Sequence, residues 1–150
     1  MNSCCKSAST EELNEILQGV LMGRQVFRDI LEQAQNEKFR ALLKQALEMF
    51  HHHETDLEVR IRCQEGTVDS GQGVMASLSE TVEKIKTMMA DSDRELLSSA
   101  IRAMDMAMKA CELYRQKHPQ ISVQTETVIE ELLKDYRKIY HELTEFRIGL

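Results

Sequence analysis

Apolar residues recur every three or four positions along most of the chain, a spacing that places them on one face of a helix. The first such stripe predicts a helix over about residues 10–35 and consists of Leu13, Ile16, Val20, Gly23, Phe27, Ile30 and Ala34. The second predicts a helix over about residues 37–65 and consists of Phe39, Leu43, Ala46, Phe50, His53, Leu57 and Ile61. Ser9 and Glu12 form a capping-box pattern at the start of the first helix, and Gly66 follows the end of the second.

Two further long stripes lie in the second half of the chain. One predicts a helix over about residues 93–117 and consists of Leu97, Ile101, Met104, Met108, Cys111 and Tyr114. The other predicts a helix over about residues 121–147 and consists of Val128, Leu132, Tyr136, Ile139, Leu143 and Phe146. Ser92 and Glu95 form another capping-box pattern, and Pro119 separates the two helices because the residue before proline disfavours the helical conformation.

A shorter stripe lies between the two pairs of long helices. It predicts a short helix over about residues 74–90, after a glycine-rich loop at 66–73, and consists of Met75, Leu78, Val82, Ile85 and Met89. Short turns within each pair make the paired helices antiparallel neighbours. We therefore predict an all-α fold, a ferritin-like four-helix bundle of two antiparallel hairpins joined by a crossover that contains a short fifth helix. A five-helix arrangement fits the periodicity as well.

Length, composition and charge narrow the class of protein. The chain has 150 residues, which suits one domain; we predict a disordered tail at 1–8 and a single bundle domain at 9–150. The net charge of −6 argues against nucleic-acid binding, and no apolar run is long enough for a membrane span. We see no secretory signal and expect a cytoplasmic protein. Its four cysteines match no zinc-binding spacing, and the adjacent Cys4 and Cys5 are interpreted as incidental.

A di-iron site is the chemistry to test first in such a bundle, because it needs inward-facing Glu residues and two Glu-x-x-His motifs. One such motif is present, formed by Glu48 and His51. Glu48 lies about 180° and His51 about 120° from the apolar stripe of the same helix, so both are expected to face solvent. No second Glu-x-x-His motif is present. We therefore expect no cofactor, with iron or manganese at an atypical site as the alternative.

The run from His51 to His53 is the most conspicuous local motif. Three consecutive helical residues fan out over about 200° and cannot bind one metal together. His53 falls on the apolar stripe beside Glu54 and is interpreted as a core histidine with a hydrogen-bond partner. His52 and Asp56 are four residues apart on the outer face and form a possible weak cation site. The candidate metal ligands are therefore Glu48, His51, His52, His53, Glu54 and Asp56.

Methionines and glycines suggest how the helices pack. Met104 and Met108 fall on a core stripe, while Met106 does not, so we interpret them as core filling, with a methionine-lined groove for a partner helix as the alternative. Gly19 and Gly23 lie in or beside the first stripe. Because glycine destabilises a helix by about 1 kcal/mol relative to alanine, we expect a neighbouring helix to approach closely there.

A charged cluster in the last helix is interpreted as a solvated face and contains Glu130, Glu131, Lys134 and Asp135.

The order and spacing of several segments resemble the bacterial ferritin-like domain family of unknown function, whose members are four-helix bundles. These segments are 13–17 (LNEIL), Gly19, Phe27, 38–43 (KFRALL), His53, Gly66 and the turn at Pro119. The resemblance covers about residues 10–148. It implies a ferritin-like bundle without an assigned activity, and it supplies no functional residue.

No catalytic motif is present, and we predict no catalytic residue. The sequence has no Gly-x-Ser-x-Gly and no phosphate-binding loop. We expect a non-catalytic bundle that acts by binding or self-association. The alternatives are a metal-handling or di-iron protein and a regulatory or stress-response adaptor that docks a partner helix. Additional apolar residues beside the stripes make a homodimer plausible and are Leu21, Leu42, Leu47 and Leu133.

Overall fold

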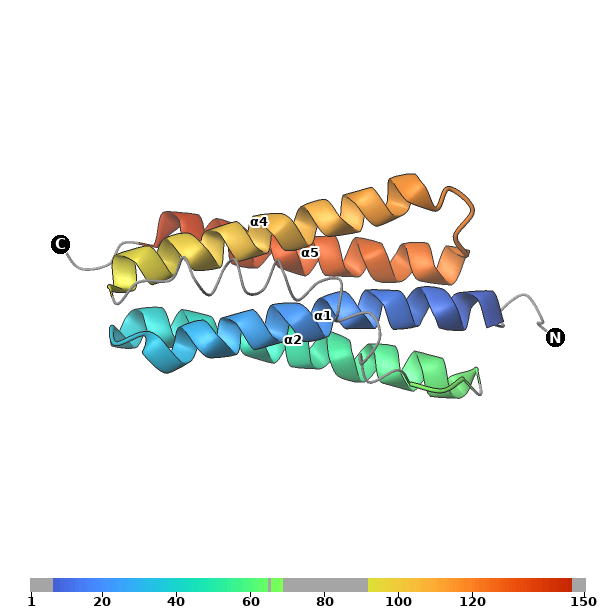
Figure 1. The fold of residues 1–150 in the computed structure, drawn as a ribbon, viewed down its shortest axis with the longest axis horizontal. Helices are drawn as coiled ribbons and strands as arrows, with labels where there is room; N and C mark the ends of the chain where they lie inside the picture. The colour runs from blue at the N-terminus through green and yellow to red at the C-terminus, as the bar shows by residue number, and fades with distance from the viewer. Residues whose placement is uncertain (1–6, 65, 69–91, 147–150) are drawn as a thin grey trace.

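Four α-helices make up nearly all of the structure, a computed structural model that describes residues 7–64, 66–68 and 92–146. They are α1 (Ser7–Gln33), α2 (Glu37–Cys63), α4 (Asp93–Lys117) and α5 (Val123–Glu145), arranged as a bundle (Figure 1). The described residues contain no strand. The prediction of an all-α fold with four long helices is therefore confirmed. None of these helices is both long and apolar enough to cross a membrane.

Side chains at the helix ends explain where the helices begin. The Asn36 side chain accepts a hydrogen bond from the Phe39 amide at 2.9 Å and begins α2. Ser92 and Ser122 act in the same way at the starts of α4 and α5. The predicted capping box at Ser9 is wrong, because α1 begins earlier, at Ser7. The other half of that box, Glu12, instead accepts a hydrogen bond from the Thr125 hydroxyl of α5 at 2.6 Å.

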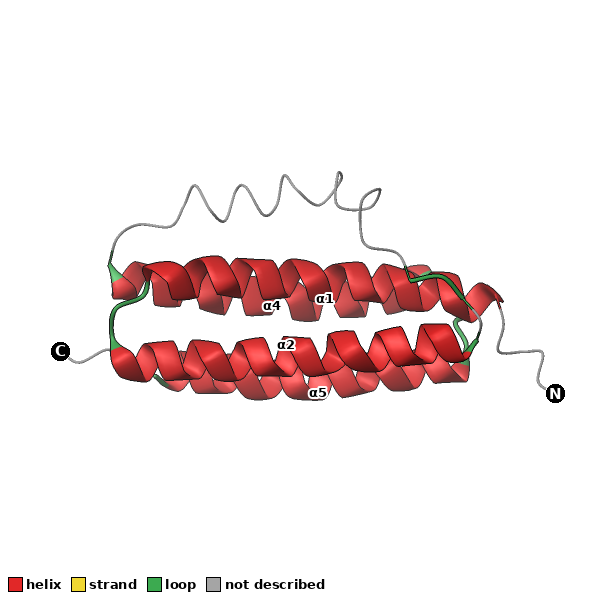
Figure 2. Ribbon diagram, turned by 90° about the horizontal axis from the view of Figure 1, so that it is seen from below, coloured by secondary structure: helices red, strands yellow, loops and turns green. Residues whose placement is uncertain are grey.

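Contacts at the two ends of the bundle fix the directions of the helices. At one end, the Thr10 hydroxyl of α1 lies 3.0 Å from the Gln64 side chain that follows α2. At the other end, the Asp93 carboxylate of α4 accepts hydrogen bonds from the amides of Gln35 and Asn36, which follow α1. Thus α2 ends where α1 begins, whereas α4 begins where α1 ends, and α2 and α4 run parallel, as the colours of Figure 1 show. Figure 2 shows the same four helices from below. The predicted crossover and its helix at 74–90 lie outside the described residues.

The core runs along the bundle axis and has an aromatic centre. The Phe50 ring lies 5.4 Å from that of Phe27 and 5.7 Å from that of Tyr136, so α1, α2 and α5 meet there. All predicted stripe residues of α1 and α2 lie in this core apart from Gly23. Leu133, expected beside a stripe, is also buried. Its burial removes it from the surface proposed for a homodimer.

The predicted face of α4 is partly wrong. Its buried residues are Leu96, Ser99, Ala100 and Met104, and only the last of these belongs to the predicted stripe. The other predicted members are half-buried and are Leu97, Ile101, Met108, Cys111 and Tyr114. The C-terminal half of α4 lines a cleft beside α1, and its apolar residues there are partly buried against the core.

The two glycines of α1 meet different surroundings. A Cβ atom at Gly23 would lie 2.6 Å from Cε1 of Phe50, so the expected close approach of a neighbouring helix is confirmed there. At Gly19, no atom of a neighbouring described element lies within 4 Å of an added Cβ, so the described helices do not show the expected close approach there. Gly19 faces the open space between α1 and α4.

Candidate functional site: an apolar cleft between α1 and α4

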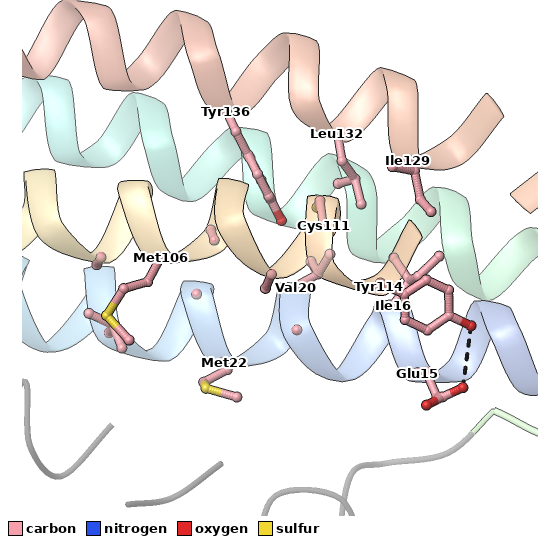
Figure 3. A pocket seen from close by; sticks show the side chains of 16 residues that line it. Glu15, Ile16, Val20, Met22, Met106, Cys111, Tyr114, Ile129, Leu132 and Tyr136 are labelled. Carbon is pink, nitrogen blue, oxygen red and sulfur yellow. Dashed lines mark hydrogen bonds between the residues drawn. The ribbon is translucent and has the colours of Figure 1, made fainter. Parts of the chain in front are cut away.

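An apolar cleft with a volume of about 360 Å³ lies between α1 and α4, near the middle of the bundle (Figure 3). Its two walls come from α1 and α4, and its floor comes from Ile129, Leu132 and Tyr136 of α5. The walls consist of Glu15, Ile16, Gly19, Val20, Met22, Gly23 and Val26 on α1, with Ala103, Met106, Ala107, Ala110, Cys111 and Tyr114 on α4. Concave, mostly apolar sites of this size are typical of small-molecule binding.

Small residues on the two facing helices create the space. Gly19 and Gly23 are four residues apart on α1, and Ala103 and Ala107 are four residues apart on α4, so each pair lies on one face of its helix. At Gly19, no described neighbour fills the room that these residues leave. Larger residues lie next to these small ones. Among them, Met22 and Met106 are only partly buried.

Tyr136 places a polar group in the otherwise apolar floor. Its side chain extends from α5 with the hydroxyl directed toward Cys111 (Figure 3). Only 3% of the residue is exposed, and its hydroxyl has no hydrogen-bond partner within the described part of the chain. Burial raises the pKa of the Tyr136 hydroxyl well above its usual value. The hydroxyl is therefore uncharged at neutral pH and can both donate and accept a hydrogen bond.

The remaining polar groups of the cleft carry no positive charge. Burial raises the pKa of the Cys111 thiol to about 12, so the thiol is also neutral near pH 7. At the mouth, the Tyr114 hydroxyl lies 3.3 Å from a Glu15 carboxylate oxygen, and the Tyr114 ring stacks on His118. Burial and nearby carboxylates, with Glu15 first among them, raise the pKa of Tyr114 as well. Among the described residues, no Lys or Arg lines the cleft.

The histidine run of α2 lies away from this cleft, and only His53 points into the core. His53 is 5% exposed, and its Nε2 atom lies 2.7 Å from a carboxylate oxygen of Asp135 on α5. The interpretation of His53 as a core histidine with a hydrogen-bond partner is confirmed. Its partner was not predicted, because Asp135 was assigned to a solvated face. His51 and His52 are exposed, as is Glu48.

The other two candidate metal ligands have separate partners. Glu54 forms an ion pair with Arg24 of α1 and lies 3.8 Å from Nδ1 of His51. Asp56 pairs with Arg60 of its own helix, at 2.8 Å. Where residues are described, no three His, Cys, Asp or Glu side chains are grouped closely enough to hold a metal ion. The structure therefore does not bring the six predicted metal candidates together.

Sequence reasoning missed the cleft, although some of its residues had been noticed. The small residues at four-residue spacing on α1 and α4 were the available pattern, together with methionines beside them. Only the two glycines were interpreted, as a close approach of a neighbouring helix, which holds for Gly23 but is not seen at Gly19 among the described residues. Met104 is fully buried in the core, whereas Met106 lines the cleft, so the methionines divide between core filling and a groove.

Comparison with known proteins identifies the family of the chain but no individual relative. The sequence matches the family model described as Domain of unknown function (DUF2383) over residues 8–117, a range that contains nearly all of α1 and the whole of α2 and α4. No curated protein and no solved structure matches the sequence.

Proposed function

The chain belongs to the DUF2383 family, whose description assigns no activity, and we propose that it is a non-catalytic bundle that binds a small apolar ligand between α1 and α4. The observation that carries this proposal is the cleft of about 360 Å³ opposite the empty face of Gly19. Mostly apolar clefts of this size typically bind small molecules, and the few polar groups at its walls would orient one.

We further propose that the bundle is ferritin-like, with a crossover that contains the short helix expected at 74–90. The parallel directions of α2 and α4 support this proposal, because one long connection between two hairpins produces that arrangement. A cytoplasmic location, proposed from the sequence, is consistent with the free thiols of Cys63 and Cys111.

The other predicted functions have less support. A metal-handling role would use the residues from Glu48 to Asp56, and these are spread over exposed, paired and buried positions. A partner helix or a second copy of the chain would need an exposed apolar strip. Leu21, Leu42 and Leu47, expected to provide it, are partly buried against the core.

Binding of diphenylhexatriene tests the proposal, because this hydrocarbon fluoresces strongly only in an apolar environment. The full chain is expected to bind about one equivalent. Gly19→Leu should remove this binding, since the new side chain extends into the cleft and meets no atom near its Cβ. Arg28→Leu is the matched control, because Arg28 is exposed on the same helix and does not line the cleft.

Two results would contradict the proposal. The full chain might show no saturable binding of the hydrocarbon, or Gly19→Leu might bind it as well as Arg28→Leu does. In the second case, the probe binds elsewhere on the molecule. Circular dichroism of both variants checks that the helices remain intact.

A further inference from the structure

We infer that the ligand of this cleft is an uncharged, elongated apolar molecule with one hydroxyl or carbonyl oxygen, which forms a hydrogen bond with the Tyr136 hydroxyl. This inference rests on the proposed function and adds the chemical class of the ligand. It depends on three properties of the cleft, namely the unpartnered hydroxyl, the absence of cationic groups and the shape of the space.

The Tyr136 hydroxyl is the group in the floor of the cleft that can form a hydrogen bond with a ligand. The hydroxyl forms no hydrogen bond in the ranges that the structure describes, and it reaches the surface of the cleft rather than being enclosed by the core. A few well-placed polar groups in a mostly apolar site fix the orientation of a ligand. The Tyr136 ring packs against Phe50 in the aromatic centre of the core. This contact keeps the hydroxyl directed toward the cleft. A ligand oxygen in the cleft would complete the interaction.

The charge distribution disfavours an ionised group inside the cleft. A buried carboxylate or phosphate needs a cation or several hydrogen-bond donors, and none of the described lining residues is Lys or Arg. Among these residues the formal charge belongs to Glu15, whose carboxylate at the mouth would repel an anion. A cation deep in the cleft would lack an anionic partner, because Tyr136 of the floor and Cys111 of the α4 wall are neutral at pH 7.

The dimensions set the size of the ligand. A dry cavity of about 150 Å³ admits benzene, so 360 Å³ encloses roughly 14 carbon atoms. Because the described residues leave the cleft open on one side, the ends of a longer molecule such as diphenylhexatriene can extend beyond it. The lining residues of α1 extend from Glu15 to Val26, which corresponds to a length of about 16 Å along a helix. An extended aliphatic chain matches this shape better than a compact ring system does.

The chain's own short amphipathic segment is the competing occupant. The stripe expected at 74–90 consists of Met, Leu, Val and Ile residues, whose side chains bring no strong hydrogen-bond acceptor to Tyr136. For this reason we favour a ligand with an oxygen atom.

Displacement of diphenylhexatriene by decanol and by decanoate tests the inference on the full chain. Decanol is expected to displace the hydrocarbon at a concentration about tenfold lower than decanoate, because only decanoate must bury a charge. Tyr136→Phe should weaken decanol binding by about tenfold, through loss of one hydrogen bond. It should leave binding of the hydrocarbon unchanged, since that probe forms no hydrogen bond. Tyr140→Phe, on the same helix and outside the lining, is the matched control.

The outcomes separate the two proposals. If the hydrocarbon binds but decanoate competes as well as decanol, the inferred ligand class is wrong. The same holds if Tyr136→Phe and Tyr140→Phe bind decanol equally well. If the full chain binds no hydrocarbon at all, the proposed function itself is overturned, and the segment at 74–90 becomes the favoured occupant. Unchanged hydrocarbon binding by Tyr136→Phe also shows that this variant is folded.

Discussion

Gly19 and Gly23 show how one residue type serves opposite purposes one helical turn apart on α1. At Gly23 the missing side chain lets the Phe50 ring pack against the helix backbone, whereas at Gly19 it leaves space open. Sequence periodicity places both glycines near the same stripe and cannot distinguish them. The difference depends on which side chains of the neighbouring helices lie opposite each glycine.

Alanine substitutions at these two positions should therefore change stability in opposite directions. Gly19→Ala is expected to stabilise the fold by about 0.5–1 kcal/mol, because alanine favours the helix and meets no neighbour. Gly23→Ala should destabilise it by about 1–2 kcal/mol. Its Cβ would displace the Phe50 ring, which is held between Phe27 and Tyr136. Urea unfolding followed by circular dichroism measures both changes.

A stabilised Gly23→Ala variant would contradict the close contact with Phe50. Destabilisation by Gly19→Ala would contradict the open space at that position. Either result would show that the cleft and the packed region of α1 have been assigned to the wrong residues.

At the scale of helices, much of the fold could be predicted from the sequence. The stripes located all four long helices, and Ser92 marked the start of α4. The buried face of α4 was predicted less well, because periodicity gives the spacing of apolar residues but not the position of the neighbouring helix. The cap at Ser9 failed for a related reason, since the interaction of Glu12 with Thr125 of α5 depends on packing between distant segments.

Hydrogen bonds to the Asp93 carboxylate join the two hairpins at one end of the bundle. This carboxylate accepts hydrogen bonds from the amides of Gln35 and Asn36, at 3.0 and 2.6 Å, and it also lies in the first turn of α4. Carboxylates are favourable at that position because of the helix dipole. Asp93→Ala is therefore expected to destabilise the fold by about 2 kcal/mol.

Arg94→Ala is the matched control for this prediction, because Arg94 is the next residue of α4 and is exposed. It should change stability by less than about 0.5 kcal/mol. Thermal unfolding of the two variants measures the difference. Equal stability of the two variants would mean that the Asp93 contacts do not join the hairpins in solution.

At the scale of the whole molecule, the site was harder to predict than the fold. The cleft depends on the separation of α1 and α4, which no local pattern encodes. His53 was placed correctly in the core, but its partner Asp135 became apparent only from the register of α2 against α5. Tyr136 fell on its predicted stripe, and only the assembled bundle directs its hydroxyl into a cavity. Contacts between functional groups on different helices thus cannot be predicted from the pattern of one helix alone.

Nuclear magnetic resonance of isotope-labelled methionine methyl groups would test the central claim, that the α1–α4 cleft binds an apolar ligand, most directly. Met22 and Met106 line the cleft, whereas Met49 of α2 does not. On titration with decanol, we expect saturable shifts of the Met22 and Met106 signals and an unchanged Met49 signal. Shifts confined to Met49, or no saturable shift at Met22 and Met106, would contradict it.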